Sequence, residues 1–126
     1  MSKVILGTDV LIDLLRGRSG MRAFLDQLTE DAVPCCSVTS VAEIMAGMRP
    51  EESGTTANLL DGLVICDVTR PIAELAGRFK GRAKGRRLGL ADCLIAATAV
   101  MEGASVATGN VRDYPMPEVT VLAAPR

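Results

Sequence analysis

Four short runs rich in β-branched residues recur along the chain, and the segments between them have the apolar spacing of helices. The runs cover residues 3–6, 32–38, 63–68 and 105–108, and a fifth lies near the end at 119–122. Strands that alternate with helices form a parallel sheet covered by helices on both faces. The sequence therefore predicts an α/β fold, and its 126 residues are enough for one domain, 1–126, with a core of its own.

Small polar residues, prolines and glycines mark where the helices should begin and end. The expected N-terminal caps are Ser19, either Thr39 or Ser40, and Thr69. The last of these opens a basic segment over residues 70–87. The stretch LADCLIAATAVMEG is the strongest helix, and Gly103 is expected to close it.

The residue types that are missing exclude several kinds of site. The chain has no histidine, which rules out a Ser-His-Asp triad and any histidine-ligated metal. It has no tryptophan, one tyrosine and two phenylalanines, too few for a surface that stacks single-stranded bases. A net charge of −1 makes no overall case for nucleic-acid binding, so any such case depends on local charge.

The cysteines indicate a reduced compartment rather than a metal or redox site. Cys35, Cys36, Cys66 and Cys93 show no C-x-x-C spacing, and the adjacent pair would make a strained disulfide. We therefore expect a cytoplasmic protein with small buried thiols. No apolar run approaches the ~20 residues that cross a membrane, so membrane association is not expected.

Three acids stand apart from the obviously exposed ones. Glu43 is embedded in SVAEIMAGM, Asp92 opens the Ala-rich helix, and Asp113 follows VATGN just past a predicted strand. Singly, each has an ordinary explanation: a partly exposed helix residue, an acid stabilised by the helix dipole, and a loop acid or Asx-turn. Together they converge, because the loops after parallel strands meet at the carboxyl edge of the sheet. Clustered carboxylates without histidine indicate Mg²⁺ or Mn²⁺, which serve phosphodiester hydrolysis.

Four segments, in order, resemble the PIN-domain ribonucleases, and most closely the VapC-type toxins of toxin–antitoxin pairs. They are VILGTDVLIDLLRG, SVTSVAEIMAGM, LGLADCLIAATAVMEGASVATGNVRDY and MPEVTVL, and the resemblance covers essentially the whole chain. It implies a three-layer α/β/α sandwich with a central, mostly parallel sheet, in which acids hold one or two Mg²⁺ or Mn²⁺ ions and a metal-activated water cleaves structured RNA. It assigns metal binding and catalysis to Glu43, Asp92 and Asp113. The supporting polar positions fall at Thr8, Thr108 and Asn110.

The first acid of the family pattern has no direct counterpart in this chain. In the family, strand one ends in a pattern like D-T-[DNS]-x-L-I, and the corresponding residues here read GTDVLI, beginning at Gly7. Asp9 can be shifted into the first acid's place, or Gly7 stands there and Asp9 takes the next polar position. We prefer the second alignment because it keeps the Val-Leu-Ile register.

On this preferred alignment the chain is expected to be catalytically impaired. Asp9 is then either a partial metal ligand, through water, or the cap of the first helix. Gly7 also has an ordinary explanation, since glycine suits a strand-to-helix turn with unusual backbone angles.

The basic segment over residues 70–87 carries seven cationic side chains and one acid, Glu74. Its candidate RNA-binding residues are Arg78, Lys80, Arg82, Lys84, Arg86 and Arg87. A solvated helix face is the alternative explanation. Glycines recur at every fourth residue from Gly77 to Gly89, and each weakens a helix by about 1 kcal/mol, so we expect fraying after about Lys84.

The resemblance also implies partners. A cognate antitoxin is expected to lay a short apolar segment in a groove, and apolar side chains exposed on the second and third helices would mark its place. A homodimer, or a hetero-oligomer with the antitoxin, is implied as well. Two other functions remain open: a non-catalytic PIN-like module that binds antitoxin or RNA, and a phosphohydrolase that acts on small phosphoesters.

Overall fold

Parallel strand pairing defines the architecture. In the computed structural model, which describes residues 2–85 and 87–126, five strands form one sheet in the order β3-β2-β1-β4-β5. The strands are β1 (Ser2–Leu6), β2 (Ala32–Ser37), β3 (Val64–Cys66), β4 (Ser105–Thr108) and β5 (Val121–Ala123). Neighbouring strands all pair in parallel within these described residues. The predicted α/β class and the predicted strands are confirmed, and the sheet is parallel throughout rather than mostly so.

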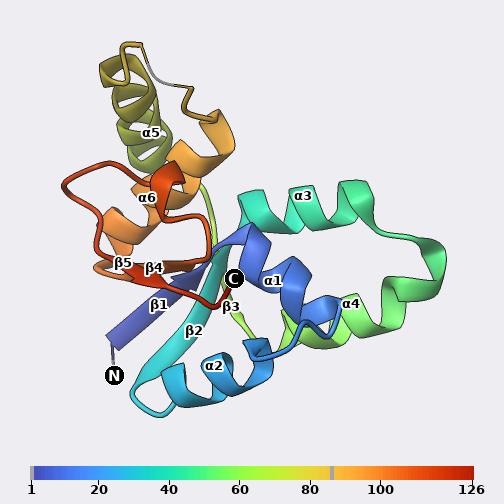
Figure 1. Ribbon diagram of the computed structural model, residues 1–126. Coiled ribbons are helices and arrows are strands. Elements are labelled where there is room, and N and C mark those ends of the chain that lie inside the picture. Colours follow the sequence, from blue (N-terminus) through green and yellow to red (C-terminus); the bar gives the residue numbers. More distant parts are fainter. Residues whose placement is uncertain (1, 86) are drawn as a thin grey trace.

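Helices cover both faces of the sheet. They are α1 (Thr8–Leu15), α2 (Met21–Leu28), α3 (Val38–Gly47), α4 (Ser53–Asp61), α5 (Arg70–Arg82) and α6 (Leu90–Glu102), with short 3-10 turns η1 (Pro50–Glu52) and η2 (Val111–Asp113). α5 and α6 pack together on one face and α1 and α2 on the other, while α3 and α4 extend to the side as a hairpin (Figure 1). This is the predicted three-layer sandwich. Among the described residues, no helix is both long and apolar enough to span a membrane.

Alternating side chains on the central strand divide the core into two halves. Ile5 faces α5 and α6, where it joins Phe79, whereas Val4 and Leu6 face α1 and α2, where they join Leu11. Half of the residues that α6 buries are alanines, whose small side chains let the helix lie close to the sheet. The four cysteines, all within the described part of the chain, are free and buried in these two halves.

Two helix boundaries agree with the prediction. Thr69 accepts a hydrogen bond from the Ile72 backbone N–H at 3.5 Å and begins α5. Gly103, with φ 64°, ends α6 in the left-handed conformation that glycine adopts most readily. α5 ends at Arg82, slightly before the fraying predicted after Lys84.

Other helix boundaries differ from the prediction. Gly20, with φ 84°, precedes α2, so the predicted cap at Ser19 is wrong. The cap predicted at Thr39 or Ser40 is wrong because the chain passes directly from β2 into α3, and Ser37 accepts a hydrogen bond from the Thr39 N–H at 3.1 Å. α4 lies in a stretch where no element was predicted, since its small polar residues give a weak apolar stripe.

Candidate active site

Polar side chains collect where β1, β2 and β4 end. Thr8 and Asp9 follow β1 in the first turn of α1, Glu43 lies in α3 after β2, and Asp113 lies in η2 after β4. Asp92 lies in the first turn of α6, the helix that leads into β4. The candidate residues therefore gather at the carboxyl edge of the sheet, where open parallel sheets bind their ligands.

The charges of the other candidate acids act on the carboxyl group of Asp92. Its pKa is raised to about 6, and burial is the largest cause. The charges of Asp113, Glu43 and Asp9 also raise this pKa, in that order of size. A hydrogen bond from Tyr114 lowers it, because it favours the charged carboxylate. Repulsion of this kind acts between near neighbours, so the four carboxylates share one region of the molecule.

Tyr114 supports Asp92 and was not among the predicted site residues. Its hydroxyl donates to Asp92 Oδ1 at 3.4 Å. Burial, and then the charges of Asp92 and Asp9, raise the pKa of Tyr114 far above its usual range, so the hydroxyl keeps its proton and acts as a donor. The sequence does hold a signal for this role, because Tyr114 is the single tyrosine and directly follows Asp113.

Thr8 connects the end of β1 to α3. Its hydroxyl donates to Glu43 Oε1 at 2.7 Å and lies 2.8 Å from the hydroxyl of Ser40. A hydroxyl has one proton to donate, so donation to Glu43 leaves Ser40 as the donor to Thr8. Ser40, which was also not predicted, is fully buried, whereas Glu43 is exposed. The relay from Ser40 through Thr8 thus fixes an exposed carboxylate from inside the protein.

Asp9 holds the loop that follows β4. The Thr108 hydroxyl donates to Asp9 Oδ1 at 2.9 Å, and the Gly109 N–H donates to Oδ2 at 2.8 Å. The Asn110 N–H in turn donates to the Thr108 hydroxyl oxygen at 3.0 Å. The N-cap of α1 is Gly7, so the suggestion that Asp9 caps this helix is wrong. Its carboxylate instead crosslinks the ends of β1 and β4.

Gly7 has backbone angles that any residue can adopt. Its φ of −64° and ψ of 157° are ordinary extended values, so the idea that glycine serves an unusual turn is wrong. A Cβ at residue 7 would lie 2.7 Å from Asp9 Oδ1 and 3.2 Å from the Ala107 carbonyl oxygen. The Asp9 carboxylate therefore occupies the space that a side chain at residue 7 would enter.

Removing the Asp9 carboxylate is expected to loosen the crosslink between β1 and β4. Hydrogen bonds to a charged group contribute about 1.5–3 kcal/mol each, and partial exposure reduces this, so Asp9→Ala should lower the free energy of unfolding by about 2 kcal/mol. Asp9→Asn keeps one acceptor oxygen and should lose about half as much. Urea unfolding measures both variants against the unchanged chain. Equal losses in the two variants would contradict a crosslink made of two bonds.

Asp92→Asn is expected to change how stability depends on pH in metal-free buffer. The folded chain holds the Asp92 proton more tightly than the unfolded chain, where the pKa is near 3.8, so the contribution of Asp92 to stability falls as the pH rises from about 4 to about 6. Asn carries no charge to bury. At about pH 7.5 the free energy of unfolding of Asp92→Asn should be about 1 kcal/mol higher than that of the unchanged chain, after allowance for partial exposure. Near pH 4 the two proteins should be equal, and an equal gain at both pH values would exclude the charge as the cause.

The donor chemistry of this edge fits Mg²⁺ or Mn²⁺. Asp9, Glu43, Asp92 and Asp113 offer only carboxylate oxygens, which hard cations prefer, and their repulsion at Asp92 is what a cation relieves. Within residues 2–85 and 87–126, no group of three or more His, Cys, Asp or Glu side chains is spaced as a ligand shell. The carboxylates would thus have to move inward around an ion.

The basic residues predicted to bind RNA differ in their surroundings. Arg82 pairs with Glu118 at 2.9 Å and lies over the Phe79 ring, 5.1 Å from its centroid. Lys80 donates to the carbonyl oxygen of Leu88. All five described members of the set are exposed, and among the described residues Arg78, Lys84 and Arg87 make no ion pair. Arg86 lies outside the described residues.

Comparisons with known proteins agree on one family. The sequence model of the PIN domain family matches residues 4–115 of this chain. The chain is 38% identical over 115 residues to the ribonuclease VapC10 of Mycobacterium tuberculosis, an alignment that covers 90% of this chain and 86% of that protein.

Solved structures with the same fold come from toxin–antitoxin complexes. A toxin–antitoxin complex from Klebsiella pneumoniae contains a chain with a TM-score of 0.80 and 25% identity, with 96% of this chain and 97% of that chain covered. A DNA-bound VapBC from Salmonella typhimurium gives a TM-score of 0.84 at 23% identity, with 98% of each chain covered, and shows the fold alone.

Proposed function

This chain belongs to the PIN-domain family and is a VapC-type ribonuclease toxin of a toxin–antitoxin system, and we propose that it hydrolyses structured RNA with the help of Mg²⁺ or Mn²⁺ at Glu43, Asp92 and Asp113. The observation that carries the proposal is the gathering of the acids at the carboxyl edge of the sheet, where burial first, and then the charges of Asp113, Glu43 and Asp9, raise the pKa of Asp92. Carboxylates that share one region repel one another unless a cation or a proton neutralises them.

The protein's own residues orient the proposed ligands. Thr8 fixes the Glu43 carboxylate at 2.7 Å, and the Tyr114 hydroxyl donates to Asp92 at 3.4 Å. Asp9 holds the backbone of Gly109 and so steadies the loop that carries Asp113. Mg²⁺ or Mn²⁺ held by Glu43, Asp92 and Asp113 would act as a Lewis acid and would activate water for hydrolysis. Such hydrogen bonds to ligand side chains commonly set the orientation of a metal site.

We attribute an impaired activity to Gly7. The glycine stands where the family pattern has its first acid, and so gives the site no ligand there. Asp9 is the nearest carboxylate, but its two oxygens accept hydrogen bonds from Thr108 and Gly109. The same observation favours a second candidate function, a non-catalytic PIN-like module that binds antitoxin or RNA.

The proposed antitoxin partner has a candidate place beside Glu43. A cavity of about 300 Å³ opens between α1, α3 and α4, and its apolar lining includes Ile12, Leu15, Ile44 and Met48. We place an apolar segment of the antitoxin there, beside Glu43, which also lines the cavity.

We further propose a cytoplasmic homodimer, alone or joined to its antitoxin. Four free thiols are in keeping with a reducing compartment. The chain is proposed to form one domain over 1–126, because β5 lies beyond the matched residues 4–115 yet pairs with β4.

An RNA cleavage assay tests the proposed function. The unchanged chain and its Gly7→Asp form are incubated with a structured RNA and, separately, with a small phosphoester, with Mg²⁺, with Mn²⁺ or with a chelator. Cleavage of RNA alone, dependent on the metal, supports the ribonuclease. Turnover of the small phosphoester alone would point to a phosphohydrolase, and no turnover with retained RNA binding would point to the non-catalytic module.

A further inference from the structure

Two arginines line one hollow beside the candidate active site. The hollow has a volume of about 460 Å³, and its lining residues are Arg87, Leu88, Arg112 and Pro115. One wall is the segment that leads into α6, the helix that begins two residues before Asp92, and the other is η2 with the residues after it. Arg112 directly precedes Asp113 in the sequence. We refer to this site as the Arg87/Arg112 hollow.

The walls of the hollow are held by the contacts that build the active site. The Tyr114 hydroxyl on one wall donates to Asp92 at the start of α6, at 3.4 Å. On the other wall, Lys80 of α5 donates to the Leu88 carbonyl oxygen. Tyr114 and Leu88 are buried, so both walls are anchored in the core while the arginine side chains remain exposed. A ligand in the hollow would therefore have a fixed position relative to the acids.

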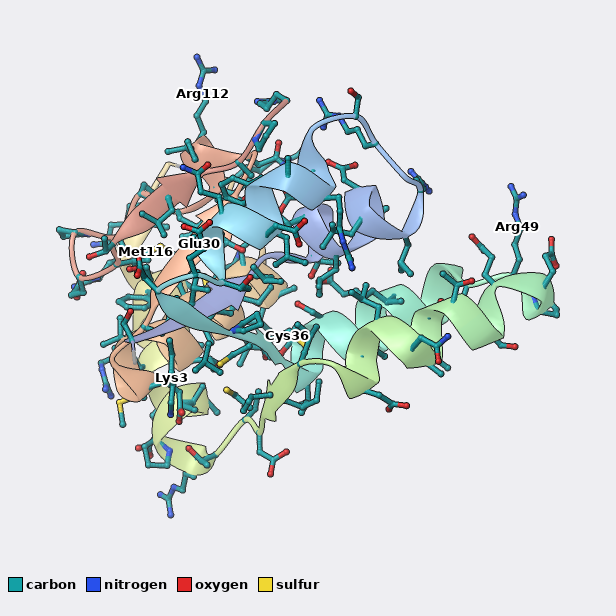
Figure 2. The ribbon with its side chains drawn as sticks, turned by 90° about the horizontal axis from the view of Figure 1, so that it is seen from below. Lys3, Glu30, Cys36, Arg49, Arg112 and Met116 are labelled. Carbon is teal, nitrogen blue, oxygen red and sulfur yellow. The ribbon has the colours of Figure 1, made fainter. Side chains whose placement is uncertain are left out.

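The two arginines of the hollow are not engaged by carboxylates in the described part of the chain. Within residues 2–85 and 87–126, neither Arg87 nor Arg112 makes an ion pair with a carboxylate. Arg82 of the same basic segment does, with Glu118. Figure 2 shows Arg112 projecting from the surface of the protein rather than folding back on it.

From these observations we infer that the Arg87/Arg112 hollow binds a backbone phosphate of RNA close to the phosphodiester that is cleaved. Guanidinium groups donate paired hydrogen bonds to phosphate oxygens, and two of them in one hollow match a single phosphodiester group. Leu88 and Pro115 leave room for a sugar but offer no side-chain polar group that reads a base. The inference rests on the proposed function, since it names how that site holds its substrate.

Binding measurements on the intact chain test this inference without any need for cleavage. Fluorescence anisotropy measures the affinity for a labelled RNA hairpin in the presence of a chelator. Repeating the measurement over a range of salt concentrations gives the slope of the logarithm of the binding constant against the logarithm of the salt concentration. Arg112→Gln and Arg87→Gln should each weaken binding about tenfold. Each should also reduce the dependence of the binding constant on salt concentration by the amount expected for about one lost phosphate contact. Arg112→Lys keeps the charge and should retain the slope while losing part of the affinity.

A matched control separates a specific contact from general charge. Arg22→Gln removes the same charge from exposed α2, where Arg22 pairs only loosely with Asp26 at 3.7 Å, and should leave RNA binding unchanged. Arg112→Gln should weaken the binding of DNA of the same sequence by the same factor as the binding of RNA, because both carry phosphate groups. Equal weakening by Arg22→Gln, no weakening by Arg112→Gln, or a loss confined to RNA would overturn the inference. If the Gly7→Asp form fails to cleave RNA while the arginine effects persist, the nuclease proposal fails and the phosphate site stands.

Discussion

Gly7→Asp is expected to raise metal-dependent RNA cleavage at least about 100-fold over the unchanged chain. The change adds a carboxylate at the edge where the other acids converge, and contacts one step removed from a metal already alter activity by about 10- to 100-fold. The backbone tolerates the change, because φ −64° is open to any residue. Asp9 has to rotate, because the new Cβ would otherwise lie 2.7 Å from its Oδ1. Cleavage of a structured RNA, with Mg²⁺ or Mn²⁺ and with chelator, measures the gain.

Gly7→Ala is the matched control for this experiment. It adds the same Cβ and displaces the Asp9 carboxylate in the same way, but it brings no new ligand, so its activity should stay at the level of the glycine form. An equal gain from Gly7→Ala would instead show that release of Asp9 restores the site, and would favour the alignment with Asp9 as the first acid.

In the Gly7→Asp background, Asp92→Asn and Glu43→Gln are each expected to reduce cleavage at least about 100-fold. Both changes keep the shape of the side chain and an oxygen that accepts the hydrogen bonds from Tyr114 and Thr8. What they remove is the negative charge that a divalent cation requires. Initial rates of RNA cleavage over a metal titration separate weaker metal binding from slower turnover.

Glu30→Gln and Asp31→Asn make the same chemical changes at exposed acids before β2, at the opposite edge of the sheet. They should leave cleavage unchanged. Rates that fall equally in these controls, or that survive both Asp92→Asn and Glu43→Gln, would place the active site elsewhere.

The arrangement of strands was predictable because its signals are local. Runs of β-branched residues, and caps such as Thr69 and Gly103, act through their own backbone neighbours. The missed features depend on contacts in three dimensions. α4 buries only Thr56 among its residues, so its sequence carries little apolar pattern. Ser37 caps α3 because β2 delivers the chain straight into the helix, which no spacing within the helix reveals.

The sequence singles out the acids of the candidate site but not the contacts that surround them. Glu43, Asp92 and Asp113 stand out because each lies near a strand end or a helix start at one edge of the sheet. The pattern of charge along a helix does not show which basic side chains form ion pairs within the folded protein. Arg82 finds its partner Glu118 36 residues away, a contact that only the folded chain brings about.

The space beside residue 7 can hold either the Asp9 carboxylate, which joins β1 to β4, or a side chain on residue 7. A side chain at residue 7 displaces an oxygen that Thr108 and Gly109 use to join β1 to β4. Gly7→Asp should therefore melt at a lower temperature than the unchanged chain, and Gly7→Ala should melt lower as well without any gain in RNA cleavage. Selection for stability would retain Gly7, whereas selection for RNA cleavage would favour an acid at residue 7 at the cost of fewer contacts between β1 and β4.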